Sequence, residues 1–547
     1  MMPFLPIILL PAAIVCWIAY LVALPRNFPR NIPVVPLWLQ VWDVLRGASK
    51  SDVYNRRIRG PIEKYGAVAL WHEGNWTILV TKPEYLIKIF KNSERTLLKK
   101  GLAERIPWGS GAKLFGINII DSDGDEYAHF RKLLKPAFSI PTTIPFMKAK
   151  SEYLADELCR EQQSTGLNAG IRVGPAVWRW ALSVWGDYFL DAQFKPLDFS
   201  QFNIQQILGV QNSKFMGRAK GLFPFLDRIP GWKWSVTQHT DTLLHQVQTM
   251  LYELAETRAK FPPAPGGENK LGFLLHPARE QKLMSEFHWG GNLKQLFIAG
   301  HENVETVLNS ALEELGSNPH IQNLLHDEVM QLLPEDYSLK DLDQLPLLNS
   351  VIYETLRLYP PLGHMTNRLT TEPFSFDSNI TIPAGVMIGW HAYGIQTDGQ
   401  IWGESARKFD PFRWGSDAAS VKQALRNRQA RGEFIPFGIF SRKCLGYTFS
   451  LQMLQCTIAE LVRNLEWQHP PGYKFSYGKV GPHNPVPFTH SCSANWLPRR
   501  RWLFPITSLW LSERGTLWQA KSGSGCVDQE LNCSYAGNVQ IEVIRGM

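Results

Sequence analysis

FIPFGIFSRKCLG, residues 434–446, places one cysteine among neighbours that a purely structural cysteine does not need. Two cations, Arg442 and Lys443, directly precede Cys444, and a helical pattern begins just after it. The N-terminus of a helix and adjacent positive charge both favour an anion. The stretch therefore predicts a position at which a thiolate is stabilised.

Three interpretations of Cys444 are open on these residues alone. A lone cysteine is most often a buried, inert side chain. A catalytic nucleophile would need a histidine and an orienting amide nearby, and no local nucleophile signature surrounds Cys444. The third interpretation is a thiolate ligand to haem iron, which donates electron density to the metal and favours cleavage of the O–O bond.

Composition limits the class of protein. The chain has 547 residues, of which 44% are hydrophobic and 19% charged, as in a large globular protein. The net charge of +8 is mild for this length, and no basic run with interleaved aromatics is present, so we expect no binding to nucleic acid. Seven cysteines without regular spacing favour a reducing compartment rather than a disulfide framework.

The first residues carry a membrane signal. Residues 4–24, FLPIILLPAAIVCWIAYLVAL, contain no charge and match the ~20 residues that span a bilayer. Arg26 and Arg30 follow, which favours a cytosolic body. A cleaved signal peptide is the alternative, but its basic start and small-residue cleavage site are not evident. We predict an anchor over residues 1–24 and a stiff proline-rich linker over 25–40.

Helical periods dominate the body. LFIAGHENVETVLNSALEEL (296–315), LPLLNSVIYETLRLYPPL (345–362) and CLGYTFSLQMLQCTIAELVRNL (444–465) each keep apolar residues on one helical face. Strand-like segments lie at VALWHEGNWTILV (68–80) and SNITIPAGVMIGW (378–390). The pattern predicts a mainly α fold with a minor β-sheet (α+β).

Several motifs, in the correct order, resemble those of the cytochrome P-450 family. The family's ligand loop reads F-G-x-G-x-R-x-C-x-G, and Phe437, Gly438, Arg442, Cys444 and Gly446 fit it, whereas Phe440 replaces the second glycine. ETLR, with Glu354 and Arg357 one helical turn apart, resembles the family's E-x-x-R. FDPFRW resembles the P-E-R-W segment, so Arg413 would join that pair, with Phe412 in place of the usual glutamate.

The resemblance, which covers about residues 40–480, implies roles for named residues. Cys444 would ligate the iron of haem b. EYAHFRKLLKPAF resembles the family's W-x-x-x-R helix, with Tyr127 for tryptophan and Arg131 retained. Contacts with the haem are implied for six residues: Tyr127, Arg131, Arg368, Phe437, Arg442 and Gly446.

A second set of implied roles concerns oxygen activation. In FIAGHENVET, the small Ala299 and Gly300 would leave space for O₂ over the iron. The family usually continues with an acid and a threonine that holds a proton-delivering water; here Glu302 and Asn303 stand at these positions. An amide both donates and accepts, so Asn303 could hold the same water. Alternatively, Asn303 only bonds the helix backbone, or it orients a substrate hydroxyl that completes the relay.

The resemblance further implies a triangular prism-like fold behind an N-terminal transmembrane helix. The chain would be a monooxygenase of the endoplasmic reticulum membrane, single-pass and facing the cytosol, similar to fungal members of secondary metabolism. It would act on a small apolar molecule with O₂ and NADPH-derived electrons. The electrons would come from a flavin reductase, with cytochrome b5 as a further partner. Two alternatives remain: rearrangement, dehydration or coupling without oxygen insertion, and an inactive haem-binding scaffold.

The C-terminal tail does not follow the family pattern. We predict a haem monooxygenase domain over residues 41–490 and a tail of doubtful structure over 491–547. Three of the seven cysteines fall in this tail, which shows no steady period. It is either a disordered extension or the translation of an intron or a shifted frame.

Overall fold

Helices make up most of the described residues in the computed structural model, with a small sheet, as the sequence predicts. The structure describes residues 23–48, 50–92, 95–165, 170–191, 215–228, 235–263, 267–469, 493–498, 510–511 and 517–518. Within these ranges, no helix combines the length and the apolar character needed to cross a bilayer. The predicted span 4–24 lies outside the described residues, apart from its last two positions.

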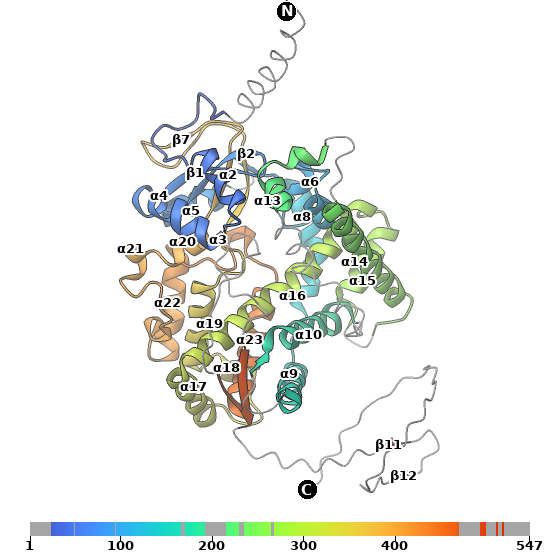
Figure 1. Cartoon of the computed structure of the whole chain (residues 1–547). Coiled ribbons are helices and arrows are strands. Elements are labelled where there is room, and N and C mark those ends of the chain that lie inside the picture. Colours follow the sequence, from blue (N-terminus) through green and yellow to red (C-terminus); the bar gives the residue numbers. More distant parts are fainter. Residues whose placement is uncertain are drawn as a thin grey trace, which may run out of the picture. The chain divides into compact units, whose positions relative to one another are not determined.

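The described α-helices follow the chain as Figure 1 labels them. They are α2 (Leu37–Leu45), α3 (Lys50–Val53), α4 (Arg59–Tyr65), α5 (Pro83–Asn92), α6 (Leu102–Arg105), α7 (Ser110–Phe115), α8 (Gly124–Leu134), α9 (Ile144–Thr165), α10 (Val173–Trp185), α13 (Phe215–Leu222), α14 (Ser235–Ala259), α15 (Leu271–Glu280), α16 (Glu286–Ser317), α17 (Pro319–Leu332), α18 (Leu339–Leu342), α19 (Pro346–Leu358), α20 (Ala392–Gln396), α21 (Gly399–Trp402), α22 (Ala418–Ala430) and α23 (Tyr447–Asn464). Helix α2 begins inside the segment predicted to be linker.

Shorter helical turns connect these elements. They are the π-helical η1 (Tyr54–Ile58) and η3 (Gly186–Leu190) and the 3₁₀ turns η2 (Lys135–Ser139), η4 (Pro224–Arg228), η5 (Pro411–Trp414) and η6 (Phe440–Arg442).

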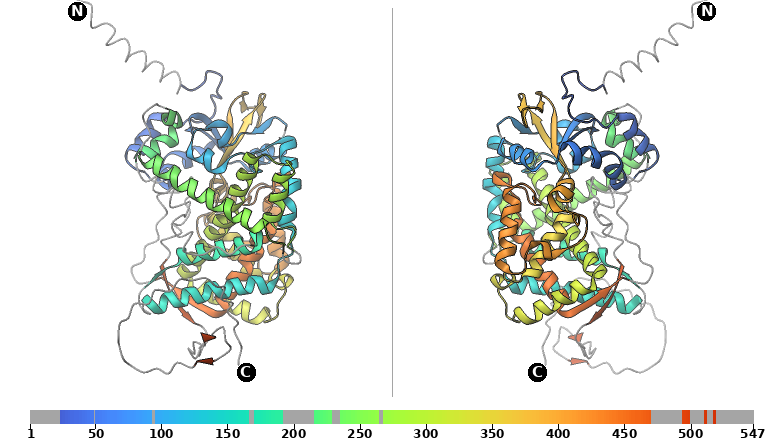
Figure 2. Two further views of the ribbon diagram at one scale, coloured as in Figure 1. Left: turned by 90° about the vertical axis from the view of Figure 1, so that its right-hand side faces the viewer. Right: turned by 90° about the vertical axis from the view of Figure 1, so that its left-hand side faces the viewer.

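A five-stranded sheet lies at one end of the body in the views of Figures 1 and 2. Its strand order is β1 (Ala67–His72), β2 (Asn75–Val80), β8 (Met387–Trp390), β5 (Met365–Thr370), β3 (Leu97–Lys99). The β1–β2 hairpin turns at Glu73 and Gly74, both with positive φ, as a two-residue hairpin turn requires. Strand β5 pairs with β3, which places Arg368 opposite Lys99.

The remaining strands form small ribbons. Strand β10 (Ser493–Pro498) pairs with β9 (Leu465–Gln468) and β4 (Ile171–Arg172), and β6 (Phe374–Ser375) pairs with β7 (Thr381–Ile382). The predicted domain boundary at residue 490 therefore precedes a paired strand. Residues 501–547 form a separate compact unit, in which β11 (Trp510–Leu511) pairs with β12 (Leu517–Trp518).

The main core lies among four helices, α9, α10, α16 and α23, which pack against one another. Helix α16 is the longest of the described helices, with 32 residues; Ser285 caps its start by accepting a bond from the His288 N–H. It ends before Pro319, the terminator predicted from GSNP. Pro346 opens α19, and Pro360 follows its end, so the segment with Glu354 and Arg357 is a rigid helix.

Candidate active site

The loop before α23 is a tight turn closed by backbone hydrogen bonds. The Cys444 N–H donates to the carbonyl of Phe437 at 2.8 Å, and the Lys443 N–H donates to the carbonyl of Phe440 at 3.2 Å. Phe440 has φ +55°, a left-handed conformation that costs a non-glycine residue about 1–2 kcal/mol. The turn therefore forms despite the missing glycine, at the cost of strain.

The Cys444 thiol has an environment different from the one its neighbours suggest. Burial raises its pKa, and a bond from the Gly446 N–H and the charge of Lys443 only partly oppose this. Arg442, predicted to favour the thiolate, instead pairs with Asp123 and donates to the carbonyl of Ser122. Lys443 is thus a neighbouring charge that favours the thiolate, whereas the effect of Arg442 on the thiol stays a prediction. Metal coordination would deprotonate the thiol outright.

Cys444 is nevertheless accessible to solvent. Burial dominates the pKa of the thiol, yet the residue as a whole is exposed. The centre of α16 shows a similar accessible strip inside a buried helix. Ala299, Gly300, Glu302 and Asn303 are partly exposed, whereas the residues from Val304 to Glu313 are buried. One accessible thiol and one accessible helix face fit a flat cofactor held by a single protein ligand.

Cations gather near this loop around the Tyr127 ring. The Arg442 guanidinium lies 3.5 Å from the ring centroid and Lys99 Nζ 6.0 Å, and Arg131 Nη1 donates to the Tyr127 hydroxyl at 3.0 Å. The hydroxyl in turn donates to the carbonyl of Ser441 at 2.8 Å, which ties α8 to the thiol loop. Burial, and then the charges of Arg368 and Arg442, lower the pKa of Lys99 well below its usual value.

Asp121 and Asp123 are the carboxylates whose charge opposes this lowering of the Lys99 pKa. We name Lys99, Arg131, Arg368 and Arg442 the cation cluster. Haem b carries two propionates, and basic side chains are the partners that such carboxylates favour.

Asn303 and Gly300 make specific contacts on α16. The Asn303 amide donates to the carbonyl of Ala299 at 3.1 Å, which is the backbone bond considered as the alternative to a catalytic role. A Cβ on Gly300 would lie 2.3 Å from the Trp185 ring. The absence of a side chain at Gly300 thus lets the indole of Trp185 pack closely against α16, and the role of Gly300 toward O₂ stays a prediction.

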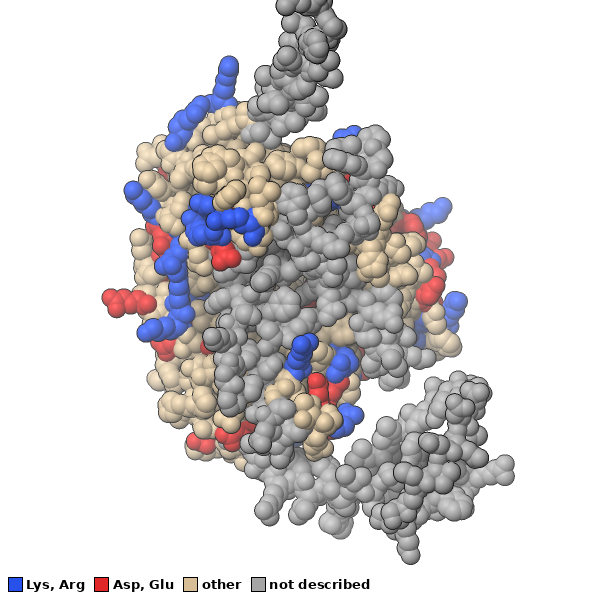
Figure 3. Space-filling view, viewed as in Figure 1, with Lys and Arg blue, Asp and Glu red and all other residues tan. Residues whose placement is uncertain are grey.

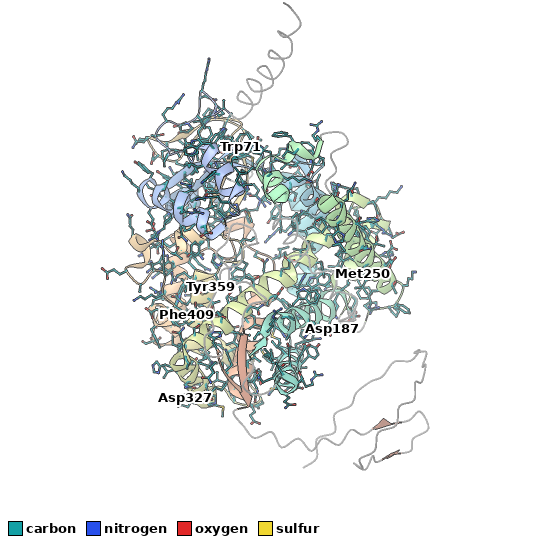
Figure 4. All side chains as sticks on the ribbon, in the orientation of Figure 1. Trp71, Asp187, Met250, Asp327, Tyr359 and Phe409 are labelled. Atoms are coloured by element: carbon teal, nitrogen blue, oxygen red, sulfur yellow. The ribbon has the colours of Figure 1, made fainter. Side chains whose placement is uncertain are left out.

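Glu354, Arg357 and Arg413 meet in an ion cluster, in which Glu354 and Arg357 are fully buried and Arg413 is partly buried. Arg357 binds Glu354 in bidentate geometry, with distances of 2.7 and 2.8 Å, and Arg413 Nε donates to the same carboxylate at 2.9 Å. The Trp414 indole N–H and the Asp410 N–H complete the set at 3.1 and 3.0 Å. The ion cluster joins α19 to η5. In Figure 4, the labelled Tyr359 follows the end of α19, and the labelled Phe409 precedes η5.

Sequence reasoning missed several members of this region. Lys99 lies in a short strand without a motif, and only the pairing of β3 with β5 brings it to Arg368. Asp121 and Asp123 precede α8 in a stretch that reads as an ordinary turn. Trp185 gave no signal, because its role depends on a glycine more than a hundred residues later.

Comparison with known proteins agrees with this geometry. The family model described as Cytochrome P450 matches residues 29–476. Cytochrome P450 monooxygenase xanG of Aspergillus fumigatus is 33% identical over 480 residues, which cover 86% of this chain and 88% of the relative. Cytochrome P450-DIT2 of Saccharomyces cerevisiae is 29% identical over 84% of this chain and 92% of the relative. Cytochrome P450 4A24 of Sus scrofa is 26% identical over 76% of this chain and 81% of the relative.

The extent of the match decides the family. It spans most of the chain, and it contains both the thiol loop and the buried ion cluster. The chain therefore belongs to the cytochrome P450 family of haem-thiolate monooxygenases.

Proposed function

We propose that this monooxygenase hydroxylates or otherwise oxidises an apolar small molecule in fungal secondary metabolism, with NADPH as the source of its electrons. The observation that carries the proposal is the accessible thiol of Cys444, in the same loop as Arg442 of the cation cluster. The relative from Aspergillus fumigatus, itself described as a monooxygenase, supports the fungal assignment.

Specific residues would hold the haem. Cys444 would supply the thiolate ligand, and the cation cluster would bind the two propionates. Phe437 and Gly446 shape the loop: Phe437 accepts the bond from the Cys444 N–H, and the Gly446 N–H bonds the sulfur. When bound, haem with a thiolate ligand activates O₂, so that one oxygen atom enters the substrate and the other leaves as water.

The chain's own residues would manage protons at the accessible strip of α16. Asn303 uses its N–H to bond Ala299, and among the described residues no bond engages its amide oxygen. That oxygen could accept a bond from a water beside this strip. Glu302, partly exposed beside it, would pass protons to this water. Glu354, Arg357 and Arg413 are structural in this account, because their polar atoms are engaged with one another and with backbone carbonyls.

A membrane location is proposed from residues 4–24 and from the surface of α2. Trp38, Trp42 and Leu45 of this helix are exposed, and Arg46 and Arg57 line the same groove. Figure 3 shows basic side chains gathered over α2 and the helices after it. Tryptophan with flanking arginine suits the interface of an anionic membrane. We place the body on the cytosolic side of the endoplasmic reticulum, served by a flavin reductase and by cytochrome b5.

The test is turnover of the full chain with a flavin reductase, NADPH and a panel of apolar probe compounds. The proposal expects products heavier by one oxygen atom, labelled when ¹⁸O₂ is supplied. Products without added oxygen would favour the rearranging or coupling alternative. No NADPH consumption by haem-loaded protein would favour the inactive scaffold.

A further inference from the structure

Helix α16 carries a row of polar residues along a buried side. Glu305, Asn309 and Glu313 are spaced four apart, so they lie one above the other on the helix, and they are only 1%, 1% and 3% exposed. Glu302 stands one turn before Glu305, with about 5–6 Å expected between such neighbours. We call Glu302, Glu305, Asn309 and Glu313 the polar row.

The middle of the row lacks protein partners. Within the described part of the chain, both carboxyl oxygens of Glu305 and both amide atoms of Asn309 are buried without a hydrogen bond. Each such group costs about 1–3 kcal/mol if it stays unsatisfied, so native proteins fill these sites with ordered water. Trp180 Nε1 on α10 and Ser350 Oγ on α19 are also without a partner, and both helices pack against α16.

The far end of the row reaches a histidine near the surface. His469 Nε2 lies 3.3 Å from the Glu313 carboxylate, 3.1 Å from the carbonyl of Glu313 and 3.1 Å from the Ser317 hydroxyl. Because carbonyls and carboxylates only accept, Nε2 carries a proton in this arrangement. The His469 side chain is 12% exposed, against 3% for that of Glu313.

The near end of the row is accessible. Glu302 is partly exposed, as is the adjacent Asn303, whereas Glu305, one turn further along α16, is buried. Burial, and then the charge of Glu302, raise the pKa of Glu305 well above its usual value. This shift favours the neutral acid, the form of Glu305 that has a proton to donate.

We propose that the polar row, linked by buried water, conducts protons from His469 to Glu302. This inference rests on the proposed role of Glu302 in oxygen activation. The Glu305 acid would pass its proton through a bridging water to the Glu302 carboxylate. It would then be reprotonated from solvent through His469, Glu313 and a water held by Asn309. The transfer moves protons only and needs no oxidant or reductant.

The decisive variant is Glu305→Gln, which keeps the size of the side chain but cannot exchange a proton. Haem-loaded full-length protein, supplied with reductase and NADPH, is assayed for hydrogen peroxide released per NADPH consumed. Without substrate, uncoupled turnover partitions O₂ between peroxide and water, so the assay needs no known substrate. In Glu305→Gln, the rate of water formation should fall by roughly a factor of ten. This loss is smaller than the ~10²-fold loss expected on removal of a group that transfers the proton directly.

A second readout does not depend on activity. Infrared spectroscopy of the wild-type protein should show a protonated carboxyl C=O band that shifts in D₂O and is absent from Glu305→Gln. If that variant does not fold, Asn309→Leu removes the water site instead and should raise the peroxide share in the same way.

Glu314→Gln is the matched control. Glu314 is a mostly buried acid on the same helix, but its carboxylate is engaged by Tyr359 and Asn318. This control should leave the peroxide share unchanged. An active, folded Glu305→Gln protein with the wild-type peroxide share overturns the polar row alone. A wild-type protein that consumes no NADPH would instead overturn the proposed function.

Discussion

The side-chain amide of Asn303 donates to the carbonyl of Ala299 across one turn of α16, with 3.1 Å between nitrogen and oxygen. This bond fixes the Asn303 side chain and directs its amide oxygen away from the Ala299 carbonyl. The residue can therefore bond the helix backbone and still hold a water, so the two interpretations of Asn303 are compatible.

Asn303→Ala should increase the hydrogen peroxide released per NADPH consumed, because the water beside Glu302 loses its holder. Haem content should not change, since Asn303 contacts no member of the cation cluster among the described residues. Asn303→Thr, which can make the same backbone bond, should stay close to the parent. Equal coupling in the alanine variant would remove Asn303 from oxygen activation.

Phe440→Gly should stabilise the protein by about 1–2 kcal/mol, because glycine adopts φ +55° without the penalty that phenylalanine pays. The thermal midpoint of the haem-loaded protein measures this. Phe440→Ala is the control, since it removes the ring but keeps Cβ and hence the strain. A glycine variant no more stable than the alanine variant would show that the turn is unstrained.

Glu354→Ala should yield little folded, haem-loaded protein. Removal of one partner from a buried ion pair costs about 3–5 kcal/mol, and here it strands both Arg357 and Arg413. Soluble yield and the ratio of haem to protein measure the effect. Glu404→Ala, at an exposed position of the same region, should behave as the parent does. Normal haem loading of the Glu354 variant would contradict the structural role.

Acidification should destabilise the fold through two buried histidines. Burial lowers the pKa of His391 to about 3 and that of His301 to about 4, so both are neutral in the native state. Below pH 6.5 the unfolded chain protonates these histidines, whereas the folded chain keeps them neutral. The stability that the neutral histidines contribute is therefore complete above pH 6.5 and is lost as the pH falls toward 3–4. Each can contribute a slope of about 1.4 kcal/mol per pH unit in this window.

Denaturant midpoints between pH 7 and 5 test this dependence. His391 Nδ1 accepts a bond from the Gly394 N–H, so His391→Asn keeps a capping acceptor while it removes the titration. That variant should show a flatter pH profile than the parent. An unchanged slope would mean that His391 does not cause the acid sensitivity.

Local patterns predicted the main helices well, because their periods and stop signals are strong. GSNP ends α16 and the prolines after Tyr359 follow α19, where the sequence suggests. The spacing of Glu354 and Arg357 also implied their contact, since residues three apart share a helical face. By contrast, Lys99 and Trp185 acquire their roles from strand pairing and helix packing, which a single sequence does not display.

Electrostatics around the thiol was the least predictable part of the site. Adjacent cations suggested a stabilised thiolate, but Arg442 turns toward Asp123, and burial raises the pKa of Cys444. Proximity along the chain gives no direction for a side chain. The distribution of charge within the cation cluster depends on four segments that only the fold brings together.

The absorption spectrum of the reduced protein under carbon monoxide tests the central claim most directly. With Cys444 as thiolate ligand to haem iron, the wild-type protein should show the strongly red-shifted Soret band of a thiolate-ligated haem, because sulfur donates electron density to the iron. Cys444→Ser should lose this band. A thiolate-type band that persists in Cys444→Ser, or one that is absent from haem-loaded wild-type protein, would contradict the account.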